Sequence, residues 1–156
     1  MSRRNISKKR FPKPDIIYNN YLVSLFISKI LKCGKKNLAK KIVYKTFEII
    51  KQKTNKNPLI IFETAIKNAS PIITVKTRRI GSSTYQIPIE INGFKSVNFT
   101  LHWIIKYAHN RIGQNISIKL ANEIIDTANN ISNTIKKKEE IHKLAELNKA
   151  FAHFKY

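Results

Sequence analysis

Apolar residues recur at intervals of three and four over the first part of the chain, which predicts amphipathic helices. The first stripe begins at about Asn20, and the first two stripes lie on either side of Gly34, a residue suited to ending a helix. Asn57 followed by Pro58 has the pattern of an N-cap with proline at the first helical position. A third helix should follow and end before Pro71, because the residue preceding a proline disfavours helical geometry.

The second half of the chain shows the same helical period three more times. A fourth helix is expected between Gly93 and Gly113, a fifth after Asn115 as its cap, and a sixth after the polar turn at residues 129–133. The stripes of these helices and of the second are expected to pack inward. The residues assigned to the core include Leu38, Ile118, Ile135, Ile141, Leu144 and Ala145.

Between the third and fourth helices the period changes to two, which is typical of a β-hairpin over about residues 72–91. Gly81-Ser82-Ser83 provides the turn, and Tyr85, Ile87 and Ile89 share one face of the second strand. A lone hairpin is marginally stable in water, so this one must lean on another element. We therefore expect a mainly α, six-helix bundle-like single domain over residues 15–156, with a protruding two-stranded arm.

Charge narrows the choice of partner. Thirty Lys and Arg against nine Asp and Glu give a net charge of +21, and self-repulsion on that scale calls for a polyanionic partner such as nucleic acid. An anionic membrane is the alternative. However, the longest uncharged run, residues 16–28, is shorter than the helix of about 20 residues that spans a bilayer. No membrane partner is therefore expected. Residues 1–14 are basic and aperiodic, and are expected to form a flexible arm that orders on RNA.

Lysines accumulate in the first two helices. No acid occurs between Asp15 and Glu48, so a phosphate-facing patch is favoured over an ordinary solvated face. On charge alone, the residues proposed to contact RNA are Lys8, Lys9, Arg10, Lys32, Lys40, Lys76, Lys136 and Lys137.

Catalytic chemistry finds little support. His102 and His109 are seven residues apart, about 10 Å along a helix, which is too far to share a metal. Cys33 is the one cysteine, so an internal disulfide and a multi-cysteine zinc site are excluded. Gly34-Lys35-Lys36 lacks the upstream glycine and the following Ser or Thr of a phosphate-binding loop. We predict no catalytic residue, no metal and no cofactor.

Three blocks resemble one family. The segments 30–36, 76–91 and 137–154 are similar, in this order, to the first interhelical turn, the hairpin and the C-terminal signature of the small-subunit ribosomal protein seven family of bacteria and organelles. The resemblance implies a structural protein that binds the 3′ major domain of small-subunit rRNA and nucleates assembly of the subunit head. It also implies that the hairpin and last helix face the exit-site tRNA and the mRNA path, with neighbouring head proteins nearby.

The resemblance also implies roles for the residues that match positions of the family. Further rRNA contacts would be Arg3, Arg4, Lys35, Lys36, Arg78 and Arg79. Residues near tRNA and mRNA would be Gly81, Ser82, Ser83, Tyr85, His142, Asn148, Lys149, Phe151, His153 and Phe154. The chain departs from the family where Ser82 replaces a second glycine and Ile16 a proline. His102, His109 and Asn110 stand at basic positions of the fourth helix, which puts rRNA contact from that helix in doubt.

Two alternative functions and the cellular compartment remain to be considered. A DNA-architectural protein would want a wedge residue at the arm's tip, which Gly81-Ser82-Ser83 lacks, and an RNA-processing enzyme would want a catalytic site. The abundance of Ile, Asn and Lys is typical of an AT-rich genome. Together with the resemblance, it predicts a plastid ribosome, the alternative being the ribosome of an AT-rich bacterium or a mitochondrion.

Overall fold

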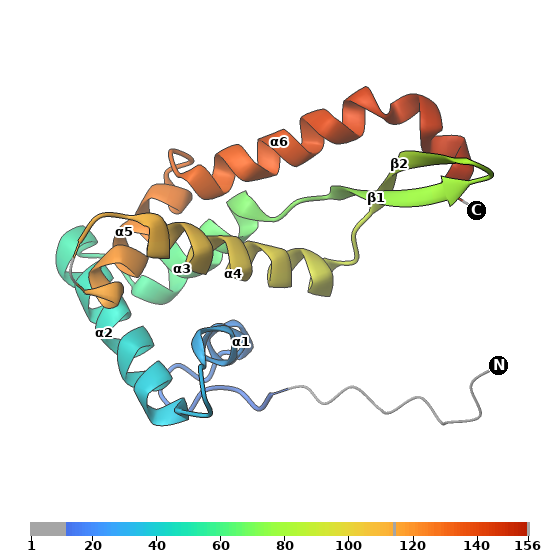
Figure 1. The fold of residues 1–156 in the computed structure, drawn as a ribbon. Helices are drawn as coiled ribbons and strands as arrows, with labels where there is room; N and C mark the ends of the chain where they lie inside the picture. The colour runs from blue at the N-terminus through green and yellow to red at the C-terminus, as the bar shows by residue number, and fades with distance from the viewer. Residues whose placement is uncertain (1–11, 114, 156) are drawn as a thin grey trace, which may run out of the picture.

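Six α-helices and one β-hairpin make up the part of the chain that the computed structural model describes, residues 12–113 and 115–155 (Figure 1). The mainly helical fold class and the hairpin are confirmed. In chain order the elements are α1 (Tyr21–Ile30), α2 (Lys36–Thr54), α3 (Pro58–Ala69), β1 (Ile73–Ile80), β2 (Ser83–Glu90), α4 (Gly93–Asn110), α5 (Ile116–Ala128), α6 (Asn133–Leu147) and the 3₁₀ helix η1 (Lys149–Lys155).

Side-chain caps set the starts of α1 and α3 where the sequence predicted them. Asn20 accepts a hydrogen bond from the backbone N–H of Leu22 at 2.8 Å. Asn57 accepts one from Leu59 at 3.0 Å, and Pro58 occupies the first helical position. Each cap satisfies a backbone donor that would otherwise lack an intrahelical partner. α1 ends at Ile30, four residues before Gly34, so the turn to α2 is longer than expected.

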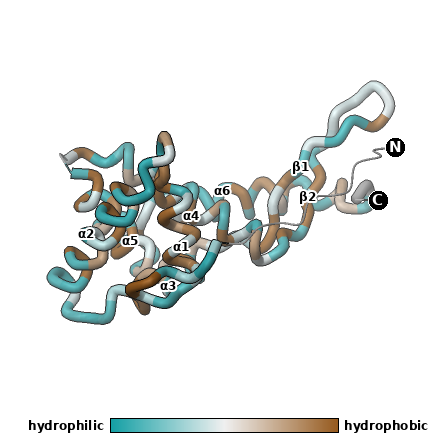
Figure 2. Tube along the Cα trace, turned by 90° about the horizontal axis from the view of Figure 1, so that it is seen from below, coloured by the Kyte–Doolittle hydropathy of each residue, from teal (hydrophilic) through white to brown (hydrophobic). Residues whose placement is uncertain are grey.

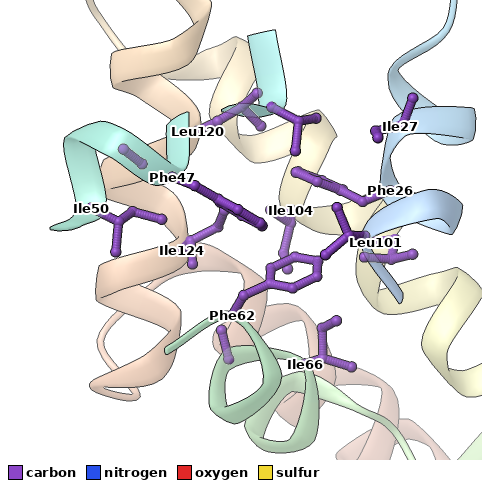
Figure 3. Packing of buried hydrophobic residues seen from close by; sticks show 14 of the residues in the cluster. Phe26, Ile27, Phe47, Ile50, Phe62, Ile66, Leu101, Ile104, Leu120 and Ile124 are labelled. Carbon is purple, nitrogen blue, oxygen red and sulfur yellow. The ribbon is translucent and has the colours of Figure 1, made fainter. Parts of the chain in front are cut away.

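The core lies where α1–α5 meet, and three phenylalanines form its centre (Figure 3). The rings of Phe26 and Phe47 lie 5.1 and 5.4 Å from that of Phe62, and all three residues are fully buried. Branched aliphatic residues of α4 and α5, such as Ile104 and Ile124, fill the space around the rings. Hydrophobic burial therefore joins helices that are far apart in the sequence.

Three residues assigned to the core are instead exposed. The exposed fractions are 54% for Leu38, 43% for Ile118 and 45% for Leu144, so their inward placement was wrong. Their immediate neighbours Ala39, Ser117 and Ala145 are buried in their place. Adjacent residues are about 100° apart around a helix, so a buried side centred on a small residue turns the larger neighbour outward. Leu144→Ala should accordingly cost much less than a core truncation.

A charged cluster around the buried Glu123 joins the end of α4 to α5 and α6. Arg111 Nε contacts Glu123 Oε2 at 2.6 Å, and the Arg111 guanidinium also contacts Asp126 at 2.5 Å. The hydroxyl of Thr134, at the start of α6, donates to Glu123 Oε1 at 2.7 Å. The Glu123 side chain is 1% exposed, so these partners compensate its desolvation. The cluster fixes the direction in which α6 leaves the body.

The hairpin projects from the helical body, as Figure 2 shows, and it is supported as predicted. α6 runs beside β1, and η1 packs on β2 (Figure 1). The two strands pair antiparallel from Ile73↔Glu90 to Ile80↔Ser83. Ile87 is fully buried beneath this support. The C-terminal segment therefore stabilises an arm that would be marginal alone.

Candidate nucleic-acid interface

The turn between α1 and α2 concentrates exposed lysines. Lys32, Lys35 and Lys36 are all exposed there, and they are held by a tight backbone. The N–H of Lys35 donates to the Lys32 carbonyl at 3.1 Å, and Cys33 and Gly34 adopt left-handed φ values of 50° and 72°. Clustering three ammonium groups on a short turn creates a site of high positive potential, which suits phosphate. We call these three residues the turn cluster.

Lys40 extends this charge along α2. It is half-buried and lines a hollow with Lys36, beside the segment that leads into α1. Asp15 borders the same hollow, but its carboxylate already accepts hydrogen bonds from the Tyr44 hydroxyl at 2.9 Å and from the backbone N–H groups of Ile17 and Tyr18. Burial and the bond to Asp15 raise the pKa of Tyr44 to about 12. The acid thus serves to fasten the chain before α1 to α2.

The tip of the hairpin presents basic side chains on both of its faces. Gly81 has a φ of 61°, as the first central residue of a type II′ turn requires, and Ser82 completes the two-residue loop. Arg79 is exposed and donates from Nε to the Gly81 carbonyl at 3.2 Å. Arg78 lies on the opposite face, because strand side chains alternate. Gly81, Ser82 and Ser83 are all exposed, as a contacting tip needs.

The strand register adds information that the sequence pattern did not supply. Lys76 pairs with Ile87, and Arg78 pairs with Tyr85. Residues directly opposite in an antiparallel pair share a face, so these two basic residues lie on the same face as the apolar residues of β2. Lys76 is exposed and Arg78 is half-buried. Cross-strand pairing of this kind depends on the exact turn length, which the alternation within one strand does not define.

Three residues expected near tRNA and mRNA take part in holding the arm. Nε2 of His142 accepts a hydrogen bond from the Ile72 N–H at 3.3 Å. The rings of Tyr85 and Phe151 lie 5.2 Å apart at 51°. A cleft of about 360 Å³ opens between the base of the hairpin and the C-terminal segment, with Glu90 and Glu146 among its lining residues. The C-terminal segment therefore holds the arm at two places, through His142 at the base of the hairpin and through Phe151 against Tyr85 nearer the tip.

The remaining C-terminal residues of this set lie between and beyond these two contacts. Asn148 ends α6, and its side-chain amide donates to the Leu144 carbonyl at 2.7 Å. Lys149 is exposed, and Nδ1 of His153 lies 2.8 Å from the Ala150 carbonyl oxygen. Phe154 belongs to η1, and its side chain lies outside the described residues.

Lys136 and Lys137 lie at the other end of α6. Lys136 is exposed, whereas Lys137 Nζ pairs with Glu140 Oε2 at 2.7 Å. This hydrogen bond raises the pKa of Lys137. The helix has 15 residues and is therefore about 22 Å long, so these lysines are well separated from the hairpin tip. Arg3, Arg4, Lys8, Lys9 and Arg10 lie outside the described residues.

The described residues contain no group of three His, Cys, Asp or Glu side chains that could hold a metal ion. His102 and His109 are both exposed on α4. Within the same described ranges, no helix combines the length and apolar character that crossing a membrane requires.

The fold and these surfaces are those of a structural, positively charged helical protein. Comparison with known families makes the assignment specific: the chain belongs to the ribosomal protein S7p/S5e family, whose sequence profile matches residues 2–149. It is 67% identical over 144 residues to the small ribosomal subunit protein uS7c of Trieres chinensis, covering 92% of this chain and 91% of that protein. Identity is 47% to uS7c of Cyanophora paradoxa and 46% to uS7 of Thermosynechococcus vestitus (strain NIES-2133 / IAM M-273 / BP-1), each over the full length of both chains.

These matches confirm the predicted family. The family is a structural, non-enzymatic component of the ribosome, so the prediction that the chain is not an enzyme is confirmed as well. The uS7c relatives confirm a plastid-type protein, and the cyanobacterial relative also fits the bacterial alternative.

Proposed function

We propose that this chain is a primary binder of the 3′ major domain of small-subunit rRNA and nucleates assembly of the head in a plastid ribosome. In this role its partners are that rRNA and neighbouring head proteins. The hairpin and the C-terminal segment face the exit-site tRNA and the mRNA path. Membership of a ribosomal protein family supports the coarse role, and the surface chemistry supports the finer one.

The observation that carries the proposal is the turn cluster. Its three exposed lysines lie on the hydrogen-bonded turn between α1 and α2, and Asp15, the nearest acid before them in the chain, is already bonded within the body. Ammonium groups neutralise phosphates and release counterions, which fixes position on RNA without reading sequence. RNA specificity then comes from shape and from unpaired bases that flat side chains stack on.

A DNA-architectural role is less well supported. Such proteins insert an apolar wedge between base steps, and the hairpin tip consists of Gly81, Ser82 and Ser83. The tip suits close approach to a backbone, since neither glycine nor serine obstructs a phosphate.

Salt dependence of binding tests the proposal. With 6–10 phosphate contacts, affinity for a transcript of the 3′ major domain should fall on the order of 10³–10⁵-fold between about 50 and 200 mM salt by the duplex-DNA scaling, somewhat less steeply on RNA. The variant Lys35→Gln/Lys36→Gln should lower the slope of log K against log salt by roughly 1–2.

The matched control is Lys51→Gln/Lys56→Gln, which removes the same charge from two exposed sites, one in the last turn of α2 and one just beyond it. It should change the slope by much less than the turn variant. Binding that barely responds to salt, or equal losses in the two variants, would contradict a localised phosphate site.

A further inference from the structure

A groove between α1 and α4 combines aromatic and basic side chains. Its volume is about 410 Å³, and it is lined by Lys29 of α1 and by Phe94, Lys95, Asn98, Phe99 and His102 of α4. α1 lies below α4 in Figure 1, seen nearly end-on, and the two helices are in packing contact. The expectation from sequence gave α4 little part in RNA binding, so this groove adds a surface that it missed.

Phe99 forms the floor of a flat platform in the groove. Its ring stacks on Trp103 at a centroid distance of 6.0 Å and an interplanar angle of 22°. Trp103 is 8% exposed and so is held by the core, whereas Phe99 remains 42% exposed. Phe94 is 41% exposed at the same groove. Open aromatic surface on a supported ring is the arrangement on which a planar group stacks.

The charge of the groove selects the kind of planar group. Lys29 and Lys95 are exposed, one from each helix, and no acid is among the lining residues. Lys29 lies in the last turn of α1, three residues before Lys32 in the chain, so the groove continues the positive charge of the turn cluster. Asn98, whose side-chain amide also donates to the Phe94 carbonyl at 2.8 Å, and the exposed His102 add polar groups beside the rings. A polyanion carrying flat rings complements all of these features.

We propose that this groove binds an unpaired nucleotide of RNA, with its base stacked on Phe99 and the adjoining phosphates at Lys29 and Lys95. The inference rests on the proposed rRNA-binding function and deepens it. It gives α4 a contact made by stacking, at a helix where His102, His109 and Asn110 stand in place of basic residues. A protein segment is the competing occupant, and the positive charge of the groove favours RNA over it.

Substitutions of Phe99 test the proposal on the transcript of the 3′ major domain. Phe99→Leu keeps an apolar side chain over Trp103 but removes the ring, and should weaken binding by roughly fivefold or more. The slope of log K against log salt should not change, because no charge is lost. Phe99→Tyr, the matched control, preserves the ring and should bind like wild type. Lys95→Gln should instead lower the slope by about one.

Four outcomes separate the possibilities. Loss of affinity in Phe99→Leu with retention in Phe99→Tyr supports a stacked base. Equal affinity of both variants and wild type, with the wild-type salt slope still steep, overturns the groove but leaves the proposed function standing. Normal RNA affinity with poor incorporation of Phe99→Leu into subunits assigns the groove to a protein and also overturns it. A wild-type chain that does not bind the transcript removes the proposed function and the groove together. Trp103, the chain's one tryptophan, reports by its emission whether each variant keeps the native platform.

Discussion

The helical body and the hairpin arm are stabilised in different ways. The body packs three fully buried phenylalanines and the aliphatic residues of five helices around one centre. The arm has one fully buried apolar residue among its described positions, Ile87, together with the Tyr85–Phe151 ring contact and the bond to His142. Apolar burial scales with stability, so the body holds most of the folding free energy. The arm's side chains are largely left at the surface, where a partner can use them.

The largest expected effect is on the centre of the body. Phe62→Ala removes the ring that contacts both Phe26 and Phe47, and should lower the free energy of unfolding by about 3–5 kcal/mol, because it leaves a cavity among fully buried neighbours. Urea denaturation followed by far-UV circular dichroism measures it. A loss below about 1 kcal/mol would mean that the core is not centred on Phe62.

The next largest effect is expected at the charged cluster around Glu123. Arg111→Met leaves the Glu123 carboxylate buried with the Thr134 hydroxyl but without its guanidinium. We expect a loss of about 3 kcal/mol, the lower end for a broken buried pair, since Arg111 is partly exposed. Chemical denaturation of Arg111→Met beside Lys119→Met, a matched loss of positive charge on α5, separates the specific pair from net charge. Equal effects of the two changes would contradict the assignment.

A smaller effect is expected at the junction of arm and C-terminal segment. A double-mutant cycle on Tyr85→Ala and Phe151→Ala should give a coupling free energy of about 0.5–1.5 kcal/mol, as for other aromatic pairs. In either single variant, the backbone amides of β2 should exchange faster than in wild type, while the amides of α4 and α5 stay protected. Zero coupling would indicate that η1 does not support the hairpin in solution. Deleting residues 149–156 should loosen the arm in the same way.

Features that depend on neighbouring residues in the chain could be predicted from the sequence, whereas features that depend on tertiary packing could not. The starts of α1 and α3 were predictable because Asn20 and Asn57 cap them through side-chain bonds that involve only neighbouring residues. The hairpin was predictable for the same reason, since its turn and alternation are local. Leu38, Ile118 and Leu144 were wrongly placed in the core. An apolar stripe shows which side of a helix is hydrophobic, but it does not show which residues of that side a neighbouring helix covers.

The sites show the same division. The turn cluster could be predicted from a run of lysines without acids, because charge accumulates along the sequence itself. The Phe99 groove could not, because Lys29 joins it from a helix about seventy residues away. Likewise, the contact of Tyr85 with Phe151 depends on the direction of α6, which Arg111, Glu123 and Thr134 fix through tertiary contacts. The spacing of residues along the sequence does not predict such long-range contacts.

The most direct test of this division is a paired measurement on Arg78→Ala/Arg79→Ala, with Lys51→Ala/Lys56→Ala as the charge-matched control. Both replaced arginines lie near the hairpin tip, outside the body's core. We expect the thermal midpoint to stay within about 3 °C of wild type, which corresponds to about 1 kcal/mol for a domain of this size. Affinity for the 3′ major domain transcript should fall, with the slope of log K against log salt reduced by roughly 1–2, and the control should bind nearly as wild type. A large drop in the thermal midpoint with intact RNA affinity would contradict the account.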